Sequence, residues 1–288
     1  MPDDQLERPS KLPLWRTIFD AHVTTFRSWR TLGQIAGIWV AAMLVIMAIL
    51  NYFVFGPISI ARIGRFGAID LVTSSVIELI ELMAVVAVAV TWHRLILLGE
   101  SGDVIPKFGR REFRYYVWVL LTSAPLWLLT FLVIFIFVGP DMPADPSPVP
   151  DTDSAFAFSD FLFSLGFLTF VFLTAAAAGY IPVRFSLILP ARALGHDDVE
   201  LRETWQRTRG NFWRLFLGFI ACSVFMTLIS MALPSEERTV FQYVRNHAVS
   251  FVLTLVGGMI GVTFLSLAYR HLFSGKFEKT RPLAPMQG

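Results

Sequence analysis

The sequence Leu201-Arg-Glu-Thr-Trp-Gln-Arg-Thr-Arg-Gly-Asn-Phe-Trp-Arg-Leu-Phe-Leu217 joins a basic, amphipathic segment directly to a long apolar run. Apolar groups at Leu201, Trp205, Thr208 (by its methyl) and Phe212 recur at helical spacing, and arginines occupy the other sides. This pattern is typical of a helix that lies at a membrane surface. We therefore expect a cytoplasmic surface helix that continues straight into a membrane-spanning helix.

The composition of the whole chain is that of a membrane protein. Its 288 residues are 55% hydrophobic and 16% charged, with a mean hydropathy of +0.61, whereas charged residues make up about a quarter of an ordinary soluble domain. A net charge of +2 is too small to indicate a nucleic-acid partner. The single cysteine, Cys222, excludes an intramolecular disulfide. Residues 1–32 lack the apolar core and small-residue cleavage site of a signal peptide.

Six apolar runs are long enough to cross a bilayer, which takes about 20 residues. Because backbone groups cannot stay unpaired in lipid, each run is expected to be a helix. The runs are 33–55, 71–92, 117–138, 161–181, 215–233 and 249–269. The predicted fold is therefore all-α, a polytopic membrane protein with six transmembrane helices in residues 33–272. A cytoplasmic amphipathic segment, 1–32, precedes this domain, and a cytoplasmic tail, 273–288, follows it.

Lysines and arginines predict the orientation of the chain. Twenty of the 24 lie on the side that holds both termini. The other four, Arg62, Arg65, Arg238 and Arg245, fall on the opposite side. Because basic residues are retained in the cytoplasm, we expect both termini to be cytoplasmic.

The N-terminal segment contains its own apolar stripe. After Pro13, which suits a first helical turn, apolar residues recur every three or four positions: Trp15, Ile18, Phe19, His22, Phe26 and Trp29. The charged residues Arg16, Asp20, Arg27 and Arg30 lie off this stripe. Two interpretations stay open: a helix lying in the plane of the cytoplasmic leaflet, or a stripe that docks on the protein's own helices.

Small residues predict where helices approach closely. The first run contains Gly33 and Gly37, the last contains Gly257 and Gly261, and 175–179 forms a third thin face. Such spacing permits close helix packing. Internal packing is the preferred interpretation, and dimerisation is the alternative.

Arginines mixed with aromatic residues precede the first, third and fifth runs. The second, fourth and sixth runs are each followed by an arginine, at positions 94, 184 and 270, and then by more apolar residues. A threefold repeat of one helical hairpin would produce this pattern. Any series of hairpins that obeys the positive-inside rule would also produce it. Both interpretations stay open.

The segment between the fourth and fifth runs carries several local signals. Pro182 is expected to kink or end its helix, and the apolar residues 184–190 are too few to span again, which favours a place at the membrane interface. Asp197 is the expected N-cap of the next helix, with Glu200 completing a capping-box pair. His196 and its two neighbouring aspartates form a turn and do not converge as metal ligands.

Glu78 and Glu81 are the sharpest chemical signal. They lie three residues apart on one face of the second run, where a charge costs at least about 2.5–3.5 kcal/mol. Two close carboxylates could share a proton in a transport site. The alternative is that they are protonated and hydrogen-bonded to neighbouring helices. His93, on the same helix, is expected to be an interfacial residue.

The candidate recognition residues belong to the segment quoted first. They are Trp205, Arg209, Phe212, Trp213 and Arg214. No nucleophile motif, phosphate-binding loop or dinucleotide fingerprint occurs, so we expect no enzyme activity, metal or cofactor. The basic face is expected to attract anionic lipids.

Residues 190–195, 201–216 and 92–100 resemble a group of uncharacterised six-helix inner-membrane proteins of proteobacteria. These proteins are distantly similar to the membrane domain of some glycerophosphoryl diester phosphodiesterases. The resemblance implies a bacterial inner membrane and no assigned activity, and the phosphodiesterase catalytic barrel is missing from this sequence. It transfers no functional residues.

Two functional hypotheses follow. The first is a non-catalytic membrane protein that organises or binds lipids or partner proteins through its basic cytoplasmic face. The second is a small proton- or cation-coupled transporter that uses Glu78 and Glu81. The oligomeric state and the partner stay open.

Overall fold

A computed structural model describes residues 11–50, 68–100, 108–138, 158–231 and 240–274, and all structural statements below concern these residues. The described chain forms helices without strands. The helices are α1 (Leu14–Arg27), α2 (Trp29–Leu50), α3 (Ala68–Leu98), α4 (Arg110–Val138), α5 (Phe158–Phe185), α6 (Ile188–Leu194), α7 (Leu201–Arg207), α8 (Phe212–Met231) and α9 (Val240–Leu272).

Each of the six predicted runs is helical in its described part, in α2, α3, α4, α5, α8 and α9 respectively. Five stretches are long and apolar enough to cross a membrane: Trp29–Ile46, Leu79–Leu98, Phe172–Leu194, Phe212–Ile229 and Val249–Leu272. α4 covers the third predicted run but is not among the five. A sixth span therefore stays a prediction.

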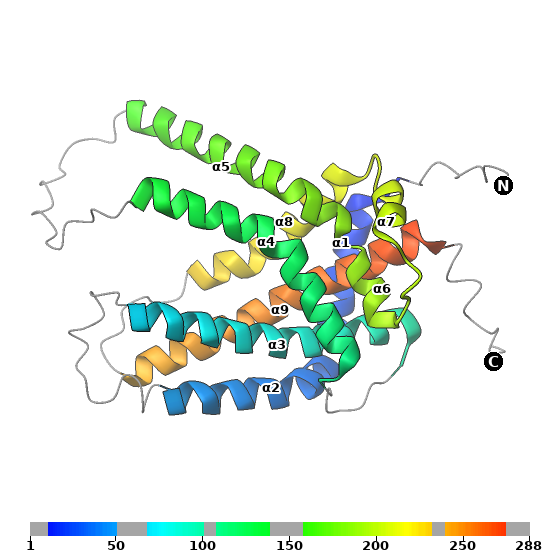
Figure 1. Ribbon diagram of the computed structural model, residues 1–288, viewed down its shortest axis with the longest axis horizontal. Helices are drawn as coiled ribbons and strands as arrows, with labels where there is room; N and C mark the ends of the chain where they lie inside the picture. Colours follow the sequence, from blue (N-terminus) through cyan, green and yellow to red (C-terminus); the bar gives the residue numbers. More distant parts are fainter. Residues whose placement is uncertain (1–10, 51–67, 101–107, 139–157, 232–239, 275–288) are drawn as a thin grey trace, which may run out of the picture.

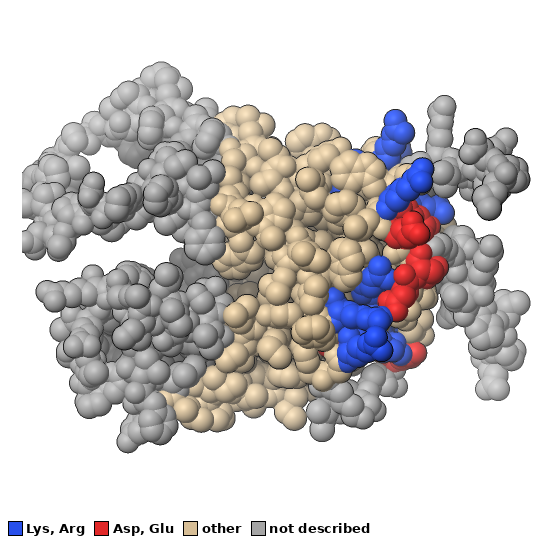
Figure 2. Space-filling model, in the orientation of Figure 1, with Lys and Arg blue, Asp and Glu red and all other residues tan. Residues whose placement is uncertain are grey.

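α9 is the central helix of the bundle, because it contacts α1, α2, α3, α6 and α8. The long helices run lengthwise through the molecule, and α1, α6 and α7 gather at one end (Figure 1). α1 runs across the direction of the long helices at this end, where the described chain both begins and ends. On the face shown in Figure 2, the charged side chains gather at the same end. We call it the charged end.

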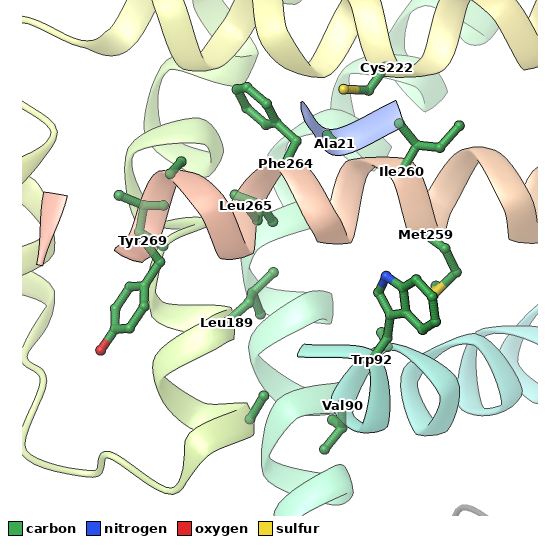
Figure 3. Close-up of a cluster of buried hydrophobic side chains, with 14 of the residues drawn as sticks. Ala21, Val90, Trp92, Leu189, Cys222, Met259, Ile260, Phe264, Leu265 and Tyr269 are labelled. Atoms are coloured by element: carbon green, nitrogen blue, oxygen red, sulfur yellow. The ribbon is translucent and has the colours of Figure 1, made fainter. Parts of the chain in front are cut away.

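The core is a dense apolar cluster around α9. Figure 3 shows α9 with Met259, Ile260, Phe264, Leu265 and Tyr269 surrounded by side chains of α1, α3, α6 and α8. All five of these side chains are buried. The cluster holds the shorter helices against the long ones, since burial of apolar side chains is the main favourable term in packing at the aqueous end.

Among the described glycines, the tightest contact occurs at one that the sequence patterns do not mark. A Cβ at Gly218 of α8 would lie 2.1 Å from Cζ of Phe264. Gly257 lies near Met226, and Gly179 near Phe216, as the packing interpretation predicts, whereas a Cβ at Gly261 would meet nothing within 4 Å. Gly33 and Gly37 meet nothing within 4 Å, so internal packing is wrong as their role.

α5 does not end at Pro182. The helix continues to Phe185, with the proline inside its last turn. The apolar residues that follow form α6, in which Ile188, Leu189 and Pro190 are buried. Because α6 packs against α3, α4 and α9, its apolar residues lie in the core and not only at a membrane interface.

The segment quoted first is not one continuous helix. α7 ends at Arg207, and the chain turns through Gly210, whose φ of 80° is left-handed, before α8 begins. Glycine adopts this conformation without a steric penalty. The expected N-cap is also wrong, because Glu200 holds the N-cap position without a side-chain cap bond. Asp197 instead binds two arginines, described below.

Candidate functional site

A buried arginine organises the junction between α5 and α7. The Arg184 side chain donates hydrogen bonds to the Tyr180 hydroxyl (2.9 Å), Thr208 Oγ1 (3.2 Å) and the Trp205 carbonyl (2.5 Å). Its guanidinium carbon lies 3.5 Å from the centre of the Trp205 ring, and the residue is 5% exposed. None of the three acceptors is a carboxylate. Stacking and neutral acceptors hold the guanidinium in this desolvated place.

This junction divides the five predicted recognition residues. Trp205 stacks on Arg184, and the Phe212 ring packs on Tyr180 (4.9 Å between ring centres). Both side chains are therefore part of the packing. Trp213 is 55% exposed, and Arg209 is exposed as well.

Arg214, the fifth of these residues, binds the chain itself. Its Nη1 donates to the Leu12 carbonyl (2.6 Å), and Asn211 Oδ1 accepts from the Leu12 N–H (2.9 Å). Leu12 is fully buried. The turn before α8 thus clamps the chain just before α1 through both backbone polar groups of one residue, Leu12.

The outward face of α1 carries large aromatic side chains. Trp15, Phe19 and Phe26 are 78%, 66% and 47% exposed, and Trp29, which begins α2, is 64% exposed. We call these four residues the aromatic sector. Docking of this stripe on the protein's own helices is therefore wrong for the aromatics, although Ile18 at its edge packs partly against the core.

The opposite face of α1 is small and buried. Thr17, Ala21 and Thr25 are its buried residues, and they lie about 200° around the helix from Trp15, Phe19 and Val23 respectively. α1 contacts α8 and α9, and the short side chains on this face let α1 pack close to them. Arg16, Asp20 and Arg27 lie between the two faces and reach solvent.

Two adjacent residues of α3 anchor a buried polar layer. Trp92 Nε1 donates to Thr263 Oγ1 of α9 (2.7 Å), which also lies 2.9 Å from Thr25 Oγ1 of α1. His93 lies 2.7 Å from Ser266 Oγ and 3.0 Å from the Tyr115 hydroxyl of α4. The layer therefore connects α1, α3, α4 and α9.

Hydrogen-bond donors and acceptors match throughout the His93 part of this layer. Ser266 donates to the Val262 carbonyl (2.8 Å), so His93 Nδ1 donates to Ser266 and Nε2 accepts from Tyr115. Burial raises the pKa of the Tyr115 hydroxyl, which keeps its proton. Because His93 is fully buried, the expectation that it is interfacial is wrong.

Asp197 bridges two helices at the charged end. One carboxylate oxygen accepts from Arg114 of α4 (2.5 Å), and the other lies 3.4 Å from Nη1 of Arg192 of α6. All three side chains retain exposure to solvent. These pairs replace the predicted capping role, because two guanidinium groups offer a carboxylate stronger partners than a backbone N–H.

The predicted acidic pair is described in part. Glu81 lies on α3, is half-buried and has an interaction partner. The side chain of Glu78 lies outside the described residues. Among the described residues, no group of three or more His, Cys, Asp or Glu side chains could hold a metal ion. The transport hypothesis stays a prediction.

Comparisons with known protein families, curated proteins and solved structures found no match to this chain. The resemblance to proteobacterial inner-membrane proteins therefore stays a prediction.

Sequence reasoning missed the polar layer and the clamp. Trp92, His93 and Tyr115 lie near the ends of apolar runs, where aromatic residues are typical of the membrane interface. Thr263 and Ser266 stand three residues apart in the last run. Polar residues at that spacing inside an apolar helix are the one signal that could have indicated an inward polar face.

Proposed function

We propose that the protein is a non-catalytic, multi-pass protein of a bacterial inner membrane that binds lipids or partner proteins through its charged end. In this proposal six helices span the membrane as three hairpins, and both termini are cytoplasmic. The contacts α2–α3, α4–α5 and α8–α9 support the hairpin arrangement.

The gathering of charge at one end carries the proposal. Figure 2 shows Lys, Arg, Asp and Glu side chains at that end and none over the apolar remainder of the same described face. Exposed aromatic side chains lie at this end too, on α1 and at Trp213. Basic residues beside aromatic ones are what a membrane surface or a protein partner recognises.

Trp213 and Arg209 are the residues to test, because both are exposed and neither holds the clamp. Trp213→Ser with Arg209→Gln should lower the recovery of crosslinked lipids or proteins from native membranes about tenfold or more, as expected when an aromatic and an arginine anchor are lost together. Mass spectrometry of the crosslinked material measures this recovery.

Leu228→Ala with Arg245→Gln is the matched control. It removes one exposed apolar side chain and one exposed arginine at the other end of α8 and α9. Recovery should stay at the level of the unmodified protein. Equal recovery with both double variants would reject the proposal, provided that their melting temperatures agree.

A further inference from the structure

We propose that the aromatic sector of α1 is a fixed site for anionic phospholipids, in which the four aromatic side chains enter the headgroup region and Arg27 and Arg30 bind phosphate groups. The inference deepens the proposed function, since it needs the charged end to face a lipid leaflet. In this proposal, anionic phospholipids cover the aromatic sector, which the protein's own helices leave exposed.

α1 presents three faces of different chemistry. One face, with Thr17, Ala21 and Thr25, packs against the protein. The face with Trp15 and Phe19 is apolar and exposed, and Arg16 and Asp20 form an ion pair (3.7 Å) on the third. A helix at the rim of a bundle at the membrane surface meets protein, lipid and water on different sides. α1 offers suitable residues to each.

α1 cannot rotate to bury its aromatic side chains. The Leu12 clamp fixes the start of α1. Near the end of α1, Thr25 contacts Thr263 in the core. Ser28 alone separates α1 from α2. The aromatic sector is therefore preorganised, so ligand binding does not have to order it.

Lipid is the occupant that the neighbouring span indicates. Trp29 continues the aromatic sector onto α2, where exposed Leu44 lies about 60° around the helix from it and exposed Ile38 and Val45 lie further round the same open side. A surface continuous with the lipid-facing side of a span lies at lipid depth. Tryptophan suits this level, because its ring is apolar and its N–H is polar.

Two arginines near the aromatic sector indicate the charge of the lipid. Arg16 is paired with Asp20, whereas neither Arg27 nor Arg30 forms an ion pair with a carboxylate among the described residues. The guanidinium carbon of Arg30 lies 5.8 Å from the centre of the Trp29 ring, and Arg27 is exposed on the adjoining polar face of α1. These two uncompensated guanidinium groups favour phosphate groups of anionic lipids.

Fluorescence quenching at two adjacent positions tests the location. Cys222 is fully buried and therefore escapes labelling. A thiol-reactive fluorophore then attaches at the introduced cysteine. The full-length protein carrying Phe19→Cys or Asp20→Cys is placed in vesicles of phosphatidylcholine and phosphatidylglycerol. Neighbouring positions point about 100° apart. A nitroxide lipid should quench position 19 at least about threefold more than position 20, and aqueous iodide should show the reverse order.

Either of two results would overturn the location. Iodide could quench position 19 as strongly as position 20, which would place the sector in water. Position 19 could also be shielded from both quenchers, which would mean that a second copy or another protein covers it.

A second comparison tests the lipid charge. Nitroxide phosphatidylglycerol should quench position 19 at least about threefold more than nitroxide phosphatidylcholine at the same content. Arg27→Gln with Arg30→Gln should reduce this ratio to about one, while Arg202→Gln with Arg270→Gln, two exposed arginines on α7 and α9, should preserve it. Equal quenching by the two lipids in the unmodified background would overturn the anionic preference. These readouts do not involve Trp213 or Arg209. Failure of the lipid site on α1 is therefore distinguishable from failure of the recognition surface in the proposed function.

Discussion

Gly218 is the described glycine with the least room for a side chain. Its added Cβ would lie 2.1 Å from the ring of Phe264, and that ring is fully buried. We predict that Gly218→Ala lowers the free energy of unfolding by about 1–3 kcal/mol, because the ring can move only by displacing packed neighbours. Thermal unfolding in detergent measures the change.

Gly33→Ala is the control for this prediction. Nothing lies within 4 Å of a Cβ at Gly33, and alanine is favoured over glycine in a helix by about 0.5–1 kcal/mol. The variant should melt no lower than the unmodified protein. If the Gly218→Ala variant had the same melting temperature as the Gly33→Ala variant, α8 and α9 would not be in contact at Gly218.

Thr263 is a second sensitive position, because it accepts the hydrogen bond of a buried indole. We predict that Thr263→Val costs about 1–3 kcal/mol, since Trp92 Nε1 would then stay buried without its acceptor. Adding Trp92→Phe should cost less than the sum of the two single changes. Ser223→Ala, at an exposed serine that bonds its own helix, should have little effect. Strict additivity in a double-mutant cycle would argue against this hydrogen bond.

At the scale of the element, α1 depends on its clamp more than on its own helix propensity. Fourteen residues make a marginal helix in isolation. Asn211→Ala should speed hydrogen exchange at the Leu12 amide about tenfold, since it removes the acceptor of that N–H. Exchange measured by mass spectrometry on N-terminal peptides reports this change.

Arg209→Ala is the matched change for the clamp, two residues away and exposed. It should leave exchange at Leu12 unaltered. Equal protection of Leu12 in both variants would mean that α1 is held by its buried small face alone.

Periodicity predicted that α1 exists and that its aromatics share a face, because spacing alone fixes which side chains align. It did not predict which face meets the protein. The aromatic stripe left docking and a place at the membrane surface equally open, and in the structure the two threonines and Ala21 pack against the protein instead. Gly33 and Gly37 were singled out by a motif, whereas the tight contact is at the isolated Gly218. Close approach depends on the partner helix, which local sequence does not contain.

At the scale of the molecule, the apolar runs and the bias of basic residues predicted an all-helical bundle with charge at one end. Hydropathy is a property of each run by itself, so no tertiary information was needed. Apart from the contact of Arg184 with nearby Tyr180, the Arg184 junction and the Trp92–His93 layer join residues between 21 and 238 positions apart in sequence, and thus depend on the packing itself. For this reason three predicted recognition residues, Trp205, Phe212 and Arg214, proved to be engaged within the protein.

The number of spans decides the topology of the whole chain. Within the described residues, five candidate spans meet the length and hydropathy requirement, and an odd number would place the two ends of the chain on opposite sides of the membrane. If α4 also spans, as its run predicts, the ends share one side. The distribution of lysine and arginine predicts this even number, because the positive-inside rule assigns both ends to the cytoplasm.

Labelling in intact cells with a membrane-impermeant maleimide distinguishes five spans from six. Buried Cys222 contributes little background. We predict that Ser147→Cys, between α4 and α5, is labelled from outside, because the third run carries the chain across. Lys11→Cys and Ser274→Cys should both react only after permeabilisation, since the basic residues near them resist translocation. External labelling of just one of these two end positions would establish an odd number of spans and remove α4 from the membrane-spanning set.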